Sequence, residues 1–170
     1  VSGASNPSLA PVGSYVDITG ASSVTAASLG YYVPVSGASS QTAAELGRYV
    51  ATTGAMAATL ASAGHYVGVT GASAQTAATP GYFVSTNGAS SQTPAGLGYY
   101  VDTAGASSQT AADLGRYVSV TGATTATLSS VGYYVNITGA SSQTAAELGR
   151  YVSSAGATIA TLAPVGTYVD

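Results

Sequence analysis

The hydrophobic and polar positions of this chain recur every 17 residues, without an insertion or a deletion. The copies begin at residues 1, 18, 35, 52, 69, 86, 103, 120, 137 and 154. Each has glycine at its third and thirteenth positions and valine at its sixteenth, as in ITGASSQTAAELGRYVS at 137–153. The sequence therefore predicts ten copies of one structural unit, here called repeats 1 to 10, with positions 1 to 17 in each.

The two glycines of each repeat, such as Gly139 and Gly149, predict two sharp changes of chain direction. A glycine kept in every copy indicates a positive φ angle or a lack of space for a Cβ atom. The segment 150–153 and its equivalents continue into the β-branched start of the next repeat, as at 135–138, and together these residues are rich in Tyr, Val, Ile and Thr, which favours a short strand. The segment 140–148 is compatible with a capped helical turn. Prolines recur within this segment in other repeats, and an interior proline costs a helix about 3 kcal/mol, so we expect an extended or irregular side. These prolines are Pro7, Pro11, Pro80, Pro94 and Pro164.

Alternation along the two segments predicts which residues point inward. Positions 4, 8, 10 and 12 share one parity, and we place them inside together with the valine of position 16. The aromatic row at position 15 then lies on the opposite face, although so regular a row is also compatible with an inward position. In repeat 9, the residues assigned to structural ladders are Gly139, Ala140, Thr144, Gly149, Tyr151 and Val152.

Parallel stacking of such coils, at about 4.8 Å per coil, predicts a rod about 50 Å long. A 17-residue unit cannot bury its apolar side alone, so its stability depends on stacking against its neighbours. We expect an all-β fold: a flattened, two-sided β-solenoid of ten coils with parallel ladders, forming a single repeat domain over 1–170. The first and last repeats lack atypical polar caps, which predicts a segment of a longer array or a filament subunit.

Composition excludes several functions. The chain has three Lys/Arg and six Asp/Glu, a net charge of −3 and 5% charged residues, against about 25% in typical globular proteins. Without a basic patch, nucleic acid is not an expected partner. No apolar run approaches about 18 residues, so no membrane-spanning helix is expected. The absence of cysteine removes disulfides and thiolate metal sites, and is compatible with export.

Gly-Tyr-Tyr-Val motifs at 30–33, 98–101 and 132–135 accompany Thr-Gly-Ala-Thr at 121–124 and Ala-Thr-Leu-Ala-Pro at 160–164. Over the whole chain these motifs resemble the Gly/Ala/Thr/Tyr-rich (GYYV-type) tandem repeats of large secreted or surface bacterial proteins. The resemblance implies an extracellular or cell-surface structural role and brings no catalytic residues with it.

Catalytic and metal sites are not expected. His65 is the only histidine and lacks a carboxylate in a pattern that would orient it, so we interpret it as a solvated surface residue. Asp17, Asp102 and Asp170 share position 17 but lie in widely separated repeats, whereas calcium needs several converging oxygens. We therefore expect no enzymatic activity, no cofactor and no metal.

Position 14 alternates between cations and aromatic rings. Arg48, Arg116 and Arg150 each follow an acidic residue three positions earlier, which predicts local ion pairs worth about 0–1 kcal/mol. Stacking of the arginines on neighbouring rings would add cation–π contacts. The same row is a candidate surface for a glycan or another copy of the chain, although simple stacking is favoured. Its candidate residues are Tyr31, Tyr82, Tyr99 and Tyr133.

A Ser-x-Thr pattern at positions 6 and 8 supplies a second candidate surface, represented by Thr93 and Thr110. A flat outward array of hydroxyls is how solenoid ice-binding proteins order water, and the pattern is loosely similar to theirs. The inward placement of threonine proposed above would remove that array. An Asn-x-Thr sequon also occurs at 136–138.

The regular end repeats favour a structural function. Head-to-tail stacking that does not close produces a filament. We predict an extracellular structural protein that forms a fibre, stalk or surface filament by self-association of β-solenoid coils end to end. The alternatives are an ice-binding module that uses a Thr/Ser array, and a glycan-binding adhesin that uses the tyrosine row.

Overall fold

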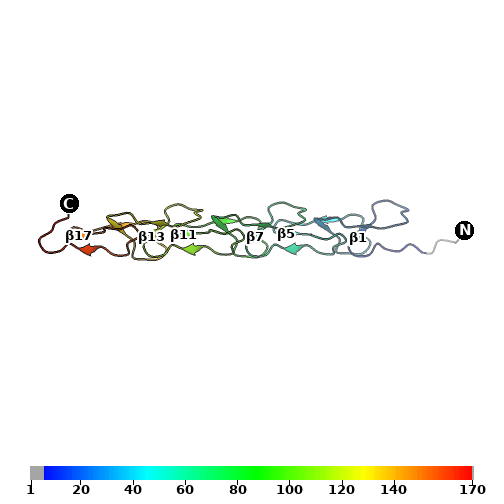
Figure 1. Cartoon of the computed structure of the whole chain (residues 1–170). Helices are drawn as coiled ribbons and strands as arrows, with labels where there is room; N and C mark the ends of the chain where they lie inside the picture. The colour runs from blue at the N-terminus through cyan, green and yellow to red at the C-terminus, as the bar shows by residue number, and fades with distance from the viewer. Residues whose placement is uncertain (1–5, 170) are drawn as a thin grey trace. The chain divides into compact units, whose positions relative to one another are not determined.

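The structure is a computed structural model and describes residues 6–169; Gly3, Ala4 and Asp170 lie outside the described residues. Within 6–169 there is no helix, and the regular structure consists of strands of two residues each (Figure 1). The all-β prediction is confirmed. The strands are β1 (Ser14–Tyr15), β2 (Thr25–Ala26), β3 (Tyr31–Tyr32), β4 (Thr42–Ala43), β5 (Arg48–Tyr49), β6 (Thr59–Leu60), β7 (His65–Tyr66), β8 (Thr76–Ala77), β9 (Tyr82–Phe83), β10 (Thr93–Pro94), β11 (Tyr99–Tyr100), β12 (Thr110–Ala111), β13 (Arg116–Tyr117), β14 (Thr127–Leu128), β15 (Tyr133–Tyr134), β16 (Thr144–Ala145), β17 (Arg150–Tyr151) and β18 (Thr161–Leu162).

Two compact units make up the chain. The N-terminal unit contains the residues up to Thr76 together with Thr86–Ser91. The C-terminal unit contains Ala77–Ser85 and the residues from Gln92 onward. The same local arrangement recurs inside each unit.

The strands pair as antiparallel hairpins. In the C-terminal unit, Tyr99 of β11 lies opposite Ala111 of β12, and Tyr100 lies opposite Thr110. The same register recurs in β9–β10, β13–β14, β15–β16 and β17–β18, and in β1–β2, β3–β4 and β5–β6 of the N-terminal unit. Positions 14 and 15 of one repeat therefore pair with positions 9 and 8 of the next. The 17-residue recurrence is confirmed, whereas the expected parallel ladders of like positions are wrong.

A tight turn at positions 11–14 precedes the first strand of each hairpin. In repeat 9, the N–H of Arg150 donates to the carbonyl of Glu147 at 3.0 Å, and Gly149 between them has a φ of 78°. Positive φ at the third residue of such a turn is the signature of a type II turn, which glycine adopts without steric cost. This turn connects strands that are not paired, such as β16 and β17. The paired strands β17 and β18 are connected by residues 152–160, which contain Gly156 with a φ of 75°.

The core consists of small residues at positions 10 and 16. Ala27 and Val33 are fully buried in the N-terminal unit, as is Ser129 at position 10 in the C-terminal unit. The hydroxyl of Ser129 donates to the carbonyl of Ala157 at 3.4 Å, so this buried polar group has a partner. The predicted inward placement of positions 10 and 16 is confirmed.

The inward placement of positions 8 and 12 is wrong. Thr144 is exposed, and Leu148 is as exposed as a free side chain. Position 4 is half-buried in most repeats and buried at Ala140. Parity predicts a shared face only along a continuous strand, and each strand here has two residues. The turns and loops between strands break the alternation.

Backbone hydrogen bonds connect each repeat to several others. In the C-terminal unit, the N–H of Gly98 in repeat 6 donates to Val118 in repeat 7 at 2.9 Å, and the N–H of Val101 donates to Ala123 in repeat 8 at 3.0 Å. A Cβ atom built on Gly98 would fall on the carbonyl of Gly139 in repeat 9. Each repeat thus packs against the next three repeats, and not only against its neighbours as expected. We call this arrangement the interlock.

The N-terminal unit contains the same interlock. The N–H of Gly30 donates to Val50 at 2.9 Å, and the N–H of Val33 donates to Ala55 at 2.9 Å. A Cβ atom on Gly30 would fall on the carbonyl of Gly71, three repeats further along. The interlock is therefore a property of the repeat itself.

Candidate binding surfaces

Each of the three arginines forms a side-chain hydrogen bond that stabilises one type of hairpin. Arg48 lies opposite Leu60, and its Nη1 donates to the carbonyl of Ala58 at 3.1 Å. The equivalent groups in the C-terminal unit have the same bond, from Arg116 to Ala126 and from Arg150 to Ala160, each at 2.9 Å. The hydrogen bond recorded for each guanidinium therefore goes to a backbone carbonyl at position 7 of the next repeat. The predicted cation–π and ion-pair roles of these arginines remain predictions.

Glutamine side chains form the hydrogen bonds that stabilise a second type of hairpin. The Oε1 atom of Gln109 accepts a hydrogen bond from the N–H of Gly96 at 2.7 Å. Every glutamine of the chain occupies position 7 and makes this bond to position 11 of the preceding repeat, at 2.7 to 2.8 Å. Sequence reasoning assigned these glutamines no role. They are Gln41, Gln75, Gln92, Gln109 and Gln143.

The predicted tyrosine surface contributes to packing. Tyr31, Tyr82 and Tyr99 are half-buried, whereas Tyr133 is 39% exposed. A Cβ atom on Gly139 would lie 3.8 Å from the hydroxyl of Tyr99, so this ring covers the glycine corner three repeats further along. Tyr31 covers Gly71 in the same way in the N-terminal unit. These tyrosines are thus less available to a ligand than their regular spacing suggests.

In the arginine hairpins, a leucine covers the glycine corner instead. A Cβ atom on Gly88 would lie 2.7 Å from Cδ2 of Leu60, and one on Gly156 would lie 2.8 Å from Cδ2 of Leu128. Tyrosine at position 14 lies opposite alanine or proline, whereas arginine lies opposite leucine. In the hairpins where the structure gives this contact, one large apolar side chain covers a glycine.

The threonine surface lies outside. Thr93 and Thr110 are exposed, as is the threonine at position 8 in every other repeat that has one. Thr93 lies opposite Phe83 and Thr110 lies opposite Tyr100, so each hydroxyl stands beside the aromatic residue of position 15. The threonine hydroxyls of position 8 are therefore at the surface, and the predicted inward placement does not apply to them.

His65 has a serine as its hydrogen-bond neighbour. The Nδ1 atom of His65 lies 3.4 Å from the hydroxyl of Ser62; Ser62 is exposed and His65 is half-buried. Among residues 6–169, no three His, Cys, Asp or Glu side chains come together in a way that could hold a metal ion. Nor does the described part of the chain contain a helix long and apolar enough to cross a membrane.

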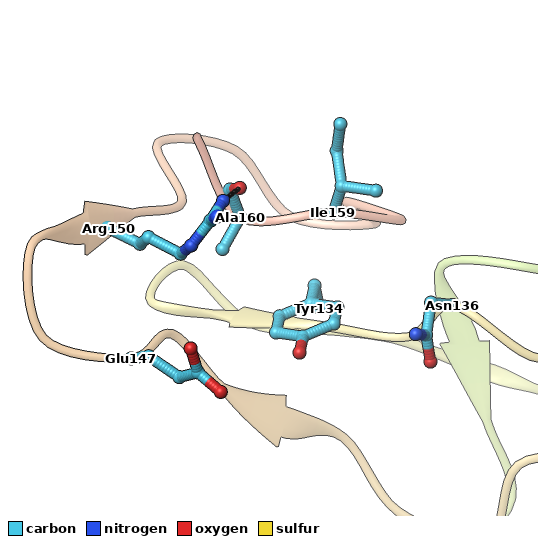
Figure 2. A pocket seen from close by; sticks show the side chains of 6 residues that line it. All are labelled: Tyr134, Asn136, Glu147, Arg150, Ile159 and Ala160. Atoms are coloured by element: carbon cyan, nitrogen blue, oxygen red, sulfur yellow. Dashed lines mark hydrogen bonds between the residues drawn. The ribbon is translucent and has the colours of Figure 1, made fainter. Parts of the chain in front are cut away.

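A polar recess of about 300 Å³ lies in the C-terminal unit. Figure 2 shows the ring of Tyr134 between Glu147 and Arg150 on one side and Asn136 on the other. Ile159 and Ala160 complete its wall. Sequence reasoning considered Glu147 and Arg150 only as an ion pair, and Asn136 only as a sequon.

A second recess of about 310 Å³ uses equivalent positions two repeats earlier. Its wall contains Tyr100, Asp102, Asp113, Arg116, Thr124, Thr125 and Ala126. Position 15 supplies the ring in both recesses, position 14 the arginine and position 11 the acid. The recess is thus another feature that the repeat produces more than once.

No protein-family model matches this chain, and no curated protein is significantly similar to it in sequence.

Proposed function

We propose that this chain is an extracellular structural protein without enzymatic activity, and that it builds a fibre, stalk or surface filament by end-to-end addition of repeats. The interlock is the observation that supports the proposal. Because each repeat offers the same donors and acceptors to the three repeats after it, the arrangement can continue without closing on itself. The parallel β-solenoid is not part of the proposal.

Open sites at the position-13 glycines indicate where a second copy would add. Nothing lies within 4 Å of a Cβ atom built on Gly132, Gly149 or Gly166, whereas at Gly98 and Gly115 the carbonyl of a later glycine occupies that space. A further repeat, in a longer chain or in a second copy, would place its own glycine carbonyl there.

Electron microscopy of the purified chain at increasing concentration tests this proposal. We expect filaments that lengthen with concentration, and fewer and shorter filaments for Gly149→Asn. Asparagine tolerates positive φ, so this change fills the open space with little backbone strain. Ser119→Asn, at an exposed position 17, is the matched control and should leave the filaments intact. Particles with the mass of one chain at all concentrations would contradict the proposal.

The exposed threonines favour a second candidate function, ice binding. Hydroxyls at position 8 recur at the surface in both units. Thermal hysteresis and ice-crystal shaping by the soluble chain would support this function, provided that both are lost when Thr93 and Thr110 are changed to tyrosine. The control is Ser119→Tyr, which adds an exposed ring outside the threonine row. Ordinary ice growth in the presence of the unchanged chain would exclude this candidate.

A further inference from the structure

The two recesses of the C-terminal unit combine side chains that neither the interlock nor the filament requires. Glu147 and Asn136 are exposed, and the structure records no side-chain hydrogen bond to another residue for either. Arg150 is different because its bond to Ala160 fixes the guanidinium in place. A guanidinium has five N–H donors, and this bond uses one of them.

These side chains match the chemistry of a sugar ring. The half-buried ring of Tyr134 offers a flat apolar face, and an aromatic face accommodates the C–H groups on one side of a pyranose. Arg150, Glu147 and Asn136 supply donors and acceptors around that face, as Figure 2 shows. A sugar hydroxyl both donates and accepts, so it can bond to each of these groups.

The charges of the recess favour a neutral ligand. Arg150 and Glu147 line the same recess with opposite charges, so neither an anion nor a cation gains a net attraction. The volume of about 300 Å³ lies at the lower end of the range for small-molecule sites. This size suits a single ring better than an extended chain.

We propose that the recess at Tyr134, Asn136, Glu147 and Arg150 binds a neutral hexopyranose unit. The recess at Tyr100, Asp102, Asp113 and Arg116 is a second hexopyranose site, in which the additional carboxylate of Asp102 replaces Asn136 and disfavours anionic sugars. This glycan site differs from the tyrosine row of position 14, which covers glycine corners. Because both recesses are open, affinity for a single sugar should be weak, with a dissociation constant on the order of 1 mM.

Saturation-transfer NMR with the full chain tests the proposal. The probes are the methyl glycosides of glucose, galactose, mannose and N-acetylglucosamine, with glucuronate as a charged comparison. We expect saturation of the ring protons of at least one neutral glycoside, and weaker binding of glucuronate. Glu147→Gln combined with Asp113→Asn should reduce the affinity at least about tenfold, because bonds from hydroxyls to a carboxylate are charge-assisted.

The arginine hairpin of the N-terminal unit supplies a matched control. Glu45 and Arg48 repeat the acid and the cation, but Pro34 stands where Asn136 or Asp102 stands and has no side-chain donor or acceptor. Glu45→Gln should therefore leave the affinity unchanged. The urea midpoints of all variants should match that of the parent chain, because the changed side chains are exposed.

Three results would overturn the proposal. One is a lack of saturation transfer to every neutral glycoside at concentrations of about 10 mM, which is above the expected dissociation constant. Another is binding that the Glu147→Gln and Asp113→Asn pair leaves intact. The third is binding that Glu45→Gln reduces equally. Filament formation does not enter this test, so the two proposals can fail separately.

Discussion

The glycines of position 13 have two separate reasons to be glycine. Gly98 has a φ of 82°, and a Cβ atom there would fall on the carbonyl of Gly139. Gly132 has a φ of 83°, yet a Cβ atom there would meet nothing within 4 Å. The chain therefore contains a pair of glycines that share the backbone conformation and differ in the space around it.

This pair predicts two different costs for the same change. Gly132→Ala should lower the free energy of unfolding by about 1–2 kcal/mol, the cost of positive φ for a residue with a Cβ atom. Gly98→Ala should cost at least about 3 kcal/mol, because the backbone of two repeats must also move apart. Urea unfolding followed by circular dichroism measures both values. Equal costs would show that the close approach at Gly98 has no energetic importance.

Ser129 shows how the core tolerates one polar residue. Alanine occupies position 10 in every other repeat, and Ser129 is fully buried. Its bond to the carbonyl of Ala157 offsets the cost of burying a hydroxyl, which is about 1–3 kcal/mol when the group lacks a partner. Among the described residues, no buried side-chain nitrogen or oxygen lacks a hydrogen-bond partner.

Every hairpin with arginine or tyrosine at position 14 belongs to one of two types. Arginine at position 14 occurs with alanine at position 7 and leucine at position 9 of the next repeat, as in Arg116, Ala126 and Leu128. Tyrosine at position 14 occurs with glutamine and a small residue at those positions, as in the hairpin that begins at Tyr99. The long guanidinium reaches over a small alanine to its carbonyl, and the opposite leucine replaces the ring over the glycine corner.

Conversion of one hairpin type into the other tests this account. Tyr99→Arg, Gln109→Ala and Ala111→Leu should each destabilise the chain by about 1 kcal/mol or more when made alone. Together they should cost clearly less than their sum, because residues in contact show coupling energies of about 0.5–3 kcal/mol. Urea unfolding of the single and triple variants measures the coupling. If the loss of unfolding free energy in the triple variant equals the sum of the three single losses, the residues that define each hairpin type are not energetically coupled.

The chain as a whole uses few charges, and the recorded bonds of its three cations go to backbone carbonyls. Its free energy of unfolding should therefore change by less than about 0.5 kcal/mol between low salt and about 1 M sodium chloride, a range over which exposed ion pairs are screened. Thermal unfolding at both salt concentrations provides the measurement. Marked destabilisation by salt would instead support the ion pairs predicted from the Glu45, Asp113 and Glu147 spacings.

The interlock also changes the expected unfolding behaviour of each compact unit. In a solenoid whose repeats contact only their neighbours, folding propagates one repeat at a time. Here the bonds of repeat 6 reach repeats 7 and 8, and its glycine packs against repeat 9. Loss of one repeat therefore weakens several others within the same unit.

The period, the glycine turns, the all-β class and the buried row at position 16 all follow from the residues alone. Each is a local property, since glycine allows positive φ and valine favours a buried extended backbone. The sequence also contains a signal that could have indicated the register. Arg48 occurs with Ala58 and Leu60 in the next repeat, whereas Tyr31 occurs with Gln41 and Ala43.

Antiparallel pairing, the exposed threonines and the two recesses depended on the tertiary structure. Identical repeats satisfy many registers equally well in sequence, because a shift by whole repeats leaves the hydrophobic pattern unchanged. The chain reverses direction between position 15 of one repeat and position 8 of the next, and the close approach of glycines three repeats apart selects one register. Both are long-range consequences of packing, and it is this packing that brings Tyr134, Glu147 and Arg150 into one recess.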